Sequence, residues 1–287
     1  MTDETLLADL HSHTTASDGM LTPSDLVERA IVNGVQMFAI TDHDTTAGLT
    51  EAHAYNNSHE TPLRLINGVE ISTRWHNHDI HIVALNIDPN DSDLDDFLIH
   101  QRSLRELRAK EIGERLAKAG IDGAYAGARA IAGDAALSRG HYARWLADKG
   151  YATSMANVFK KYLARGKIGY VPNNWSDMAT AIEVIHKAGG IAVLAHPSGY
   201  KLSTKWVKRL VREFKEAAGD AMEVVLSQQT VDARNFLISQ CLQHELLASL
   251  GSDFHFPGSW TELGKSMYQP PGVNWVWQMD SWPLASA

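Results

Sequence analysis

The chain has 287 residues and a mass of 31.6 kDa, which suffices for one large α/β domain or two smaller ones. Hydrophobic residues make up 44% and charged residues 21%, so disordered, collagen-like and coiled-coil proteins are excluded. The net charge of −8 argues against a general binder of duplex DNA. The sequence shows neither a signal peptide nor an apolar run of roughly 18 residues, and its one cysteine, Cys241, excludes an intrachain disulfide. We therefore expect a cytoplasmic protein that needs no membrane and no protein partner.

Short apolar runs separated by helical patterns predict βα units and a largely parallel sheet. The seven runs lie at 6–10, 37–41, 63–72, 81–87, 191–195, 222–227 and 246–249. Helices are expected at 24–33, 45–55, 177–188, 204–218 and 231–244. The third and fourth runs are separated only by residues 73–79, which are too few for a crossover helix. These two strands should therefore form an antiparallel hairpin.

The strand pattern disappears between residues 98 and 167. Leu104, Leu107, Ile112 and Leu116 mark a long amphipathic helix there, and shorter helical patterns follow at 142–147 and 155–163. This segment contains 14 Lys and Arg but only 6 Asp and Glu, which suggests that it faces an anion. A basic helical surface without a partner is the alternative. We expect three parts, a first part of the α/β domain at 1–97, a basic helical insertion at 98–167 and a second part of the α/β domain at 168–287.

Side chains that bind metals follow most of the predicted strands. The carboxyl ends of parallel strands meet at one edge, and the i, i+2 spacing of His11 and His13 places both side chains on one face. A single such histidine is more often structural, but nine of these groups would be costly to bury unpaired. Nine ligands exceed the needs of one ion, so we expect two or three divalent ions with one bridging carboxylate. The expected ligands are His11, His13, Asp18, His43, Glu70, His81, His196, Asp253 and His255.

These residues resemble the motifs of the PHP (polymerase and histidinol phosphatase) superfamily. The resemblance rests on His11-x-His13, Ser17-Asp18-Gly19, Thr41-Asp42-His43-Asp44-Thr45, Glu70, His81, His196 and Ser252-Asp253-Phe254-His255. It implies a distorted, TIM-like (β/α)7 barrel with a helical insertion domain and a trinuclear metal centre. We expect Mn²⁺, with Zn²⁺ or Fe²⁺ as alternatives, because nitrogen and oxygen ligands without thiolate suit all three.

The resemblance also distributes the ligands over the three metals. The first metal would bind His11, His13, Glu70 and Asp253, and the second would bind Glu70, His81 and His196. The third would bind Asp18, His43 and His255, with Asp18 at a position where some members have histidine. Glu70, His196 and Asp253 are the expected catalytic residues. Among their neighbours in sequence, Asp44 is expected to cap the following helix, while Asp42 and Asp9 are candidates for orienting ligands.

Within the superfamily the chain most resembles nucleoside 3′,5′-bisphosphate phosphatases and the related 5′→3′ exoribonucleases of the RNase AM type. The matching motifs are Ser138-Arg139-Gly140-His141, Arg165-Gly166-Lys167 and Tyr170-Val171-Pro172. The resemblance implies a metal-dependent phosphoric ester hydrolase that converts pAp to AMP and phosphate through a metal-bridging hydroxide. A 5′→3′ exoribonuclease acting on short 5′-phosphorylated RNA is the alternative. A phosphatase of another small substrate, such as histidinol phosphate, is the lesser alternative.

The substrate-binding residues are expected in the basic insertion. Residues 139–167 include seven basic side chains and one acidic side chain, and guanidinium groups fit phosphate oxygens well. Arg139 and Lys167 are expected to hold the second phosphate, with a hydrogen bond from His141. Trp175 or Tyr170 is a candidate for stacking on the base. The structural alternatives are a solvated charge for each cation and a core position for each aromatic ring.

Two rival interpretations are tested by particular residues. A metal-dependent amidohydrolase also begins with His-x-His, but such sites usually bridge their metals with a strand lysine, and none of the predicted strands contains lysine. Here Glu70 would fill that role. A PHP domain retained only for structure or nucleotide sensing would be expected to have lost ligands, whereas all nine are present.

Overall fold

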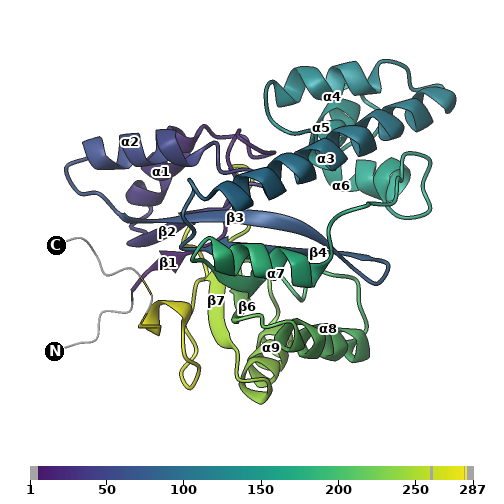
Figure 1. Cartoon of the computed structure of the whole chain (residues 1–287). Helices are drawn as coiled ribbons and strands as arrows, with labels where there is room; N and C mark the ends of the chain where they lie inside the picture. The colour runs from purple at the N-terminus through teal and green to yellow at the C-terminus, as the bar shows by residue number, and fades with distance from the viewer. Residues whose placement is uncertain (1–5, 259–260, 281, 283–287) are drawn as a thin grey trace.

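The computed structural model describes residues 6–258, 261–280 and 282 (Figure 1). One sheet contains seven strands that pair in the order of the sequence. β4 is antiparallel to both β3 and β5, whereas the other neighbouring pairs are parallel. The strands are β1 (Ala8–Asp9), β2 (Met37–Ile40), β3 (Arg64–Trp75), β4 (His78–Leu85), β5 (Ile191–Leu194), β6 (Ala221–Leu226) and β7 (Leu247–Gly251). The predicted hairpin is confirmed, although its strands continue to Trp75 and from His78.

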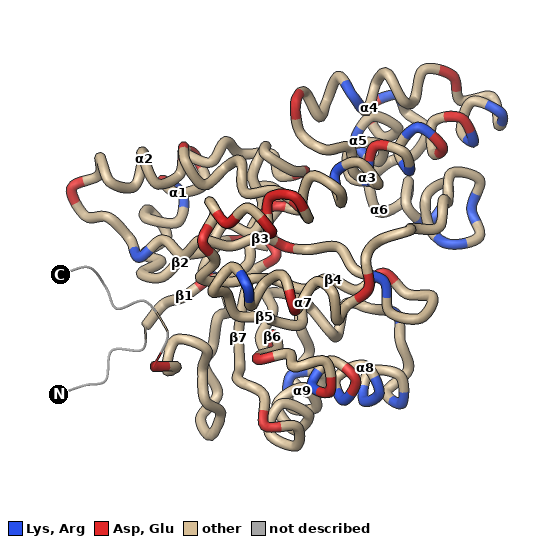
Figure 2. The backbone as a smooth tube through the Cα atoms, in the orientation of Figure 1, with Lys and Arg blue, Asp and Glu red and all other residues tan. Residues whose placement is uncertain are grey.

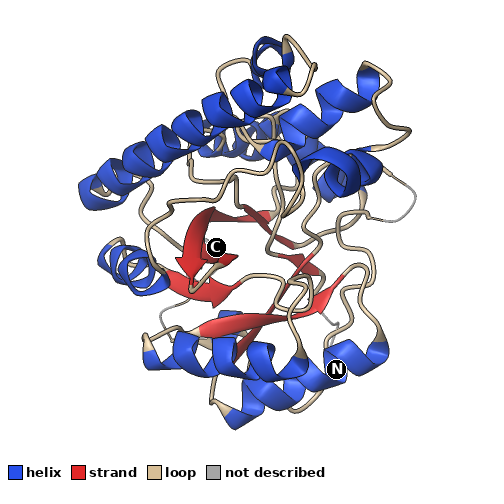
Figure 3. Ribbon diagram, turned by 90° about the vertical axis from the view of Figure 1, so that its right-hand side faces the viewer, coloured by secondary structure: helices blue, strands red, loops and turns tan. Residues whose placement is uncertain are grey.

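The sheet curls until its first and last strands meet. The backbone N–H of Leu10 donates to the carbonyl of Leu250 at 3.2 Å, and the N–H of Asp253 donates to the carbonyl of His11 at 2.9 Å. The result is a nearly closed barrel with helices outside the strands, as Figure 3 shows. The predicted seven-stranded, TIM-like barrel is therefore confirmed. Its wall consists mainly of buried aliphatic side chains, as expected for strands covered on both faces.

Five helices cover the outside of the barrel: α1 (Pro23–Val32), α2 (Leu49–Ser58), α7 (Met178–Lys187), α8 (Thr204–Glu216) and α9 (Val231–Gln243). Thr22, Asp177 and Thr230 begin three of them as N-caps whose side chains accept backbone N–H groups. The expected start of α2 at residue 45 was wrong, because the backbone at Asp44 still hydrogen-bonds to β3. Asp44 does not cap this helix. Its carboxylate accepts hydrogen bonds from Arg105 and from the N–H of Ser72.

The basic segment forms a layer of helices above the barrel (Figure 1). It contains α3 (Ser92–Lys118), α4 (Ala124–Ala132), α5 (Arg139–Asp148), α6 (Met155–Val158) and the π-helical turn η1 (Phe159–Leu163). Leu116, Tyr142 and Leu146 belong to a second core in this layer. Helix α4 was not predicted from the sequence, because its buried face consists only of alanines. The separate core supports the proposed insertion, and α3 begins ahead of the expected boundary at residue 98 with Asp91 as its N-cap.

The C-terminal segment returns to the barrel and packs against its first and last strands. Trp275 pairs with Ala248 of β7, and a short 3₁₀ helix, η2 (Val276–Gln278), follows. The N–H of Gly264 donates to the buried carboxylate of Asp9 at 2.9 Å. None of the helices in the described ranges is long and apolar enough to cross a membrane.

Candidate metal centre

Glu70 lies at the centre of a histidine cluster in the barrel mouth. Its side chain is fully buried in β3. Oε1 lies 2.9 Å from both His81 Nδ1 and His196 Nε2, and Oε2 lies 2.8 Å from His43 Nδ1. His11 and His13 approach the same carboxylate with their Nε2 atoms at 3.4 and 3.3 Å. One carboxylate is thus within reach of five imidazoles from four strands or strand ends, which suits a bridging ligand.

Asp253 approaches the same cluster from the end of β7. Its Oδ1 atom lies 3.5 Å from His11 Nε2 and 3.3 Å from His13 Nε2. Its backbone has a φ of 53° and that of His196 a φ of 31°, values that L-residues rarely adopt. Backbone strain of this kind is concentrated at functional sites. At these two residues, just after β5 and β7, the chain turns out of the extended conformation of the strand.

A third group lies between the barrel and the helical layer. Asp18 Oδ1 is 3.4 Å from His255 Nε2 and 3.9 Å from His43 Nε2. Ligand atoms of Asp18, His43, His255 and His13 all lie within 4.8 Å of one another. Two further sets meet the same criterion, namely His11 with His13 and Glu70, and His43 with Glu70 and His81. The structure therefore brings together all nine residues that were predicted as ligands.

Several polar atoms of this cluster lack hydrogen-bond partners within the described structure. They are His13 Nδ1, His43 Nδ1, Asp18 Oδ1 and Glu70 Oε2, all of them buried. His43 Nδ1 and Glu70 Oε2 are 2.8 Å apart but lack the angles of a hydrogen bond. Such atoms are costly to bury unless they pair with a cation or a hydrogen-bond donor. Divalent ions would satisfy them, because the set combines imidazole nitrogen with carboxylate oxygen. The residues present therefore fit a metal centre of the predicted kind.

Protonation of the cluster also suits metal binding. Burial lowers the pKa of His13 to about 3, so that its imidazole is neutral at pH 7. Burial opposes ionisation of Glu70, but His81, His43 and His11 hold its pKa well below the ordinary value. Burial also opposes a charge on His255, but Asp253 and Asp18 raise its pKa to about 10. Binding of cations would therefore displace a proton from His255, as expected when a histidine becomes a ligand.

Three further carboxylates hydrogen-bond to predicted ligands or to the segments that carry them, but they do not belong to the predicted ligand set. Glu223 accepts from His11 Nδ1 at 2.6 Å and from the N–H of His196 at 2.5 Å. It was missed in the sequence, although it is the one charged residue in the apolar run at 222–227. Asp42 accepts from Thr14 and Ser17, which fixes the turn before Asp18 rather than a histidine ring. Asp9 accepts the N–H of Ser252 at 2.8 Å and so holds the loop that carries Asp253.

A basic pocket of about 240 Å³ adjoins the metal cluster on the side of the helical layer. Its walls include Asp18, His43 and His81 of the cluster, and Arg108, Arg139 and Arg144 of the insertion. Arg108 and Arg139 share one carboxylate, each with a guanidinium nitrogen 3.6 Å from Asp79 Oδ2. Nη2 of Arg108 and Nε of Arg144 are buried without a hydrogen-bond partner among the described residues. Two guanidinium groups thus have donors available to an anion.

The predicted substrate residues are placed differently from one another. Arg139 lines the basic pocket, with its guanidinium 5.9 Å from the centre of the Phe159 ring. His141 is buried outside the lining, and its Nδ1 accepts the N–H of Ser138 in a capping box at the start of α5. Lys167 is exposed and also lies outside the lining. Their roles as phosphate ligands stay predictions.

Of the two aromatic candidates, Trp175 reaches the pocket. It is buried and lies under Arg105 and Arg108, with ring distances of 5.2 and 5.5 Å. Tyr170 is outside the lining, and its carbonyl accepts from Arg115. The sequence analysis missed Arg108 and Arg144, because each is one of many basic residues in helical patterns that carry no local motif.

Residues 9–188 match the family model of the PHP domain. The chain belongs to the PHP domain family. It is 53% identical over 285 residues to the 5′-3′ exoribonuclease Rnm of Salmonella typhimurium, covering 99% of this chain and 97% of the relative. It is 39% identical over 272 residues to a 3′,5′-nucleoside bisphosphate phosphatase of Chromobacterium violaceum, covering 94% and 95%.

A solved structure from Chromobacterium violaceum has a TM-score of 0.89 and 39% identity, with 94% of each chain covered. It is described as an amidohydrolase with bound sulfate and no metal. The family and the two relatives confirm that this PHP protein is a phosphoric ester hydrolase, as predicted. No strand in the described part of the chain contains the lysine expected of a metal-bridging amidohydrolase site.

Proposed function

We propose that this PHP enzyme is a 5′→3′ exoribonuclease that acts on 5′-phosphorylated RNA. The observation that carries the proposal is the basic pocket, in which Arg108, Arg139 and Arg144 lie in one cavity with the edge of the metal cluster. A terminal 5′-phosphate bound by these arginines would place the first phosphodiester, on the 3′ side of the same nucleotide, at the metals. The 53% identity to the exoribonuclease Rnm supports the same substrate.

The charges of the pocket favour a multiply charged anion. Burial lowers the pKa of Arg108 to about 10, and the neighbouring guanidinium of Arg139 acts in the same direction. One carboxylate, that of Asp79, is shared by Arg108 and Arg139, so it offsets only one of their two positive charges. A phosphate dianion would neutralise the remaining positive charge and accept a hydrogen bond from Nη2 of Arg108, which lies 3.6 Å from Asp79 and makes no hydrogen bond within the described residues. Trp175 and Phe159 supply apolar walls on which a base can lie.

The catalytic roles follow from the positions of the side chains. Bound divalent ions would supply Lewis-acid stabilisation of the phosphoryl group and lower the pKa of water. Glu70, His196 and Asp253, together with the six other predicted ligands, would hold these ions in the mouth of the barrel. The arginines would hold the substrate by its 5′-phosphate, so that binding energy remote from the reacting phosphorus orients the ester. We propose Mn²⁺ as the metal and the cytoplasm as the location, where the buried thiol of Cys241 stays reduced.

Hydrolysis of the 3′-phosphate of nucleoside 3′,5′-bisphosphates is the second candidate, although the sequence analysis ranked it first. The same geometry serves it, because a 3′-phosphate monoester and a 3′-phosphodiester would occupy the same position at the metals. The phosphatase from Chromobacterium violaceum, at 39% identity, favours this activity. The higher identity to the exoribonuclease places RNA first.

The test compares Mn²⁺-loaded protein on 5′-phosphorylated RNA, the same RNA with a 5′-hydroxyl, adenosine 3′,5′-bisphosphate and AMP. Arg139→Ala should lower kcat/KM for both 5′-phosphorylated substrates about 10- to 100-fold, the loss expected for a charged hydrogen bond. It should change cleavage of 5′-hydroxyl RNA much less. Arg129→Ala is a matched control, because Arg129 is similarly exposed, pairs with Glu106 and lies outside the pocket.

Two results would contradict the proposal. Equal cleavage of 5′-hydroxyl and 5′-phosphorylated RNA by the wild-type protein would show that the basic pocket does not read the 5′-phosphate. Release of phosphate from adenosine 3′,5′-bisphosphate without shortening of RNA would replace the exoribonuclease with the second candidate.

A further inference from the structure

A second basic surface lies on α8, outside the basic pocket. The helix TKWVKRLVREFKE carries five Lys and Arg residues and two Glu residues, and Figure 2 shows blue segments along it with red between them. A groove of about 450 Å³ between α8 and α9 is lined by Lys205, Lys208, Arg209 and Arg212, with Trp206 beside them. Gln240, Gln243 and His244 complete the lining, which contains no carboxylate. We name this surface the α8 groove. It concentrates positive charge on a chain whose net charge is −8.

Two of these cations are not neutralised by the protein. Arg209 pairs with Glu213 at 2.6 Å, and Arg212 lies 3.7 Å from Glu216. Lys205 and Lys208 have no ion-pair partner among the described residues. They leave the α8 groove with a positive charge that an external anion can neutralise.

Trp206 gives the groove a flat apolar surface beside its cations. Its side chain is partly exposed, and the guanidinium of Arg209 lies 5.2 Å from the ring centre. The ring contacts the hairpin through Trp75 at 5.5 Å and His78 at 5.7 Å. An aromatic platform next to phosphate-binding cations is typical of surfaces that bind single-stranded nucleic acid.

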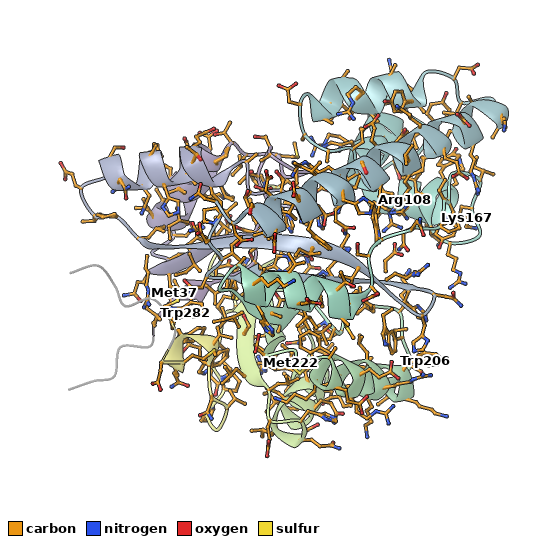
Figure 4. The ribbon with its side chains drawn as sticks, in the orientation of Figure 1. Met37, Arg108, Lys167, Trp206, Met222 and Trp282 are labelled. Atoms are coloured by element: carbon orange, nitrogen blue, oxygen red, sulfur yellow. The ribbon has the colours of Figure 1, made fainter. Side chains whose placement is uncertain are left out.

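The hairpin connects the metal centre to this platform. His81 of the metal cluster pairs across the hairpin with Ser72, and the strands continue for three residues to the pair Trp75 and His78. At about 3.3 Å per residue this extension spans roughly 10 Å. The guanidinium of Arg165 adds to burial in lowering the pKa of His78, so a cation of the insertion lies near the same tip. In Figure 4, Arg108 and Lys167 are above the hairpin and Trp206 is below it.

We propose that the α8 groove and Trp206 bind the part of a single-stranded RNA that lies 3′ of the scissile linkage. The proposal rests on the proposed function, in which the basic pocket holds the 5′-phosphate. Asp79 of the hairpin borders that pocket, so the rest of the RNA would cross the hairpin to its other side, where Trp206 lies. Lysine side chains contact phosphates and the indole stacks on a base, so the surface selects single strands without reading their sequence.

A binding measurement tests this surface without requiring turnover. The probe is a 5′-phosphorylated 12-nucleotide RNA with a 3′ fluorophore and a phosphorothioate at its first linkage, added to Mn²⁺-loaded protein and followed by fluorescence anisotropy. Lys205→Gln/Lys208→Gln should weaken binding about tenfold and reduce the salt slope by about 1.4, the value for two contacts to a single strand. Lys118→Gln/Lys149→Gln is the matched control, since both lysines are exposed at the C-terminal ends of α3 and α5.

Trp206 is tested separately. Trp206→Ala should weaken binding about five- to hundredfold, as expected for loss of one stacked base. Trp206→Phe keeps an aromatic ring and should restore most of the affinity, whereas Trp206→Leu keeps an apolar side chain against Trp75 without an aromatic face and should not. Equal affinity of wild type, the double lysine variant and Trp206→Ala for this RNA would overturn the proposal. Equal binding of duplex RNA would overturn it as well.

The dependence of kcat/KM on RNA length distinguishes failure of the α8 groove from failure of the proposed exoribonuclease activity. The double lysine variant should lower the ratio of kcat/KM for the 12-nucleotide RNA to that for a 5′-phosphorylated dinucleotide about tenfold, whereas the control should leave the ratio unchanged. A wild-type kcat/KM that does not depend on RNA length would overturn the α8 groove while the exoribonuclease stands. Absence of RNA cleavage would overturn the exoribonuclease, and the anisotropy measurement would still decide whether the groove binds RNA.

Discussion

The hydroxyl of Ser138 donates a hydrogen bond to Oδ2 of Asp18 at 2.7 Å, although the two residues are 120 positions apart. Ser138 is the N-cap of α5 in the basic insertion, and Asp18 belongs to the third ligand group in the barrel mouth. Gly140 permits this approach, because a Cβ atom there would lie 2.9 Å from the same oxygen. The start of one helix thus orients a predicted metal ligand and closes the end of the basic pocket.

Replacement of Ser138 should therefore affect metal content as well as stability. Ser138→Ala should weaken binding at the third site about 10- to 100-fold, the usual loss when the partner of a ligand is removed. Loss of the N-cap should in addition cost about 1 kcal/mol of stability. Metal stoichiometry by mass spectrometry of the purified protein checks the first effect. Ser154→Ala removes the N-cap of α6 instead and should leave the metal content unchanged.

Glu223 should be as important for metal binding as the residues it supports. Glu223→Gln removes the charge that faces His11 and weakens the acceptor for the N–H of His196. We expect the affinity for the first two metals to fall about 10- to 100-fold. Competition with a chelator of known affinity measures the change. Glu216→Gln, at an exposed site on α8, should behave as wild type, and an unchanged affinity in Glu223→Gln would refute the role.

The buried pair of Asp44 and Arg105 should dominate the attachment of α3 to the barrel. Arg105 Nε donates to Asp44 at 2.5 Å, and Nη2 donates to Ser72 at the same distance. Arg105→Ala leaves Asp44 charged and buried, so we expect a loss of about 3–5 kcal/mol in the free energy of unfolding. Lys187→Ala breaks the exposed pair with Glu183 and should cost less than about 1 kcal/mol. Urea denaturation of both variants makes the comparison, and similar losses would contradict it.

The stability contribution of Glu213 should depend on pH. Burial opposes ionisation of this residue, but hydrogen bonds from Arg209, Trp75 and His76 lower its pKa to about 2. Because the folded-state pKa lies below the unfolded value of about 4.5, the contribution is complete above pH 4.5 and is lost as the pH falls toward 2. The difference in stability between wild type and Glu213→Gln should therefore shrink between pH 5 and pH 3. Thermal unfolding of metal-free protein measures it, and a constant difference would exclude the assigned pKa.

The clustering of the nine candidate ligands was predictable because their signal is local. His11 and His13, or Asp253 and His255, are close in sequence and follow recognisable apolar runs, and the geometry of parallel strands brings strand ends together whatever their distance along the chain. The hairpin was predictable for a similar reason, since a short connection permits only an antiparallel pair. The family resemblance then distributed the nine residues over three metals, with Glu70 as the bridge between the first two.

Residues that act through packing between distant segments had no comparable signal. Glu223 was hidden in an apolar strand, and Arg108 and Arg144 were two cations among many until the helices placed them in one pocket. His141 illustrates the opposite case, because it belongs to a recognised motif, yet its Nδ1 accepts the N–H of Ser138 and the residue lies outside the lining of the basic pocket. Asp44 was expected to cap α2, but the tertiary contact with Arg105 prevailed over the local preference.

The sequence by itself predicted the strands, because strand periodicity is a property of neighbouring residues. Its motifs, through their resemblance to the PHP superfamily, predicted the barrel, the hydrolase family and the nine residues that the structure brings together in the barrel mouth. Only the tertiary structure decided which cations of the insertion face the metals and which side chains orient the ligands. It also placed Trp206 and the lysines of α8 beyond the tip of the hairpin. The physical reason is that helix packing brings together side chains from remote turns, and their pairing depends on angles and distances that no local pattern encodes.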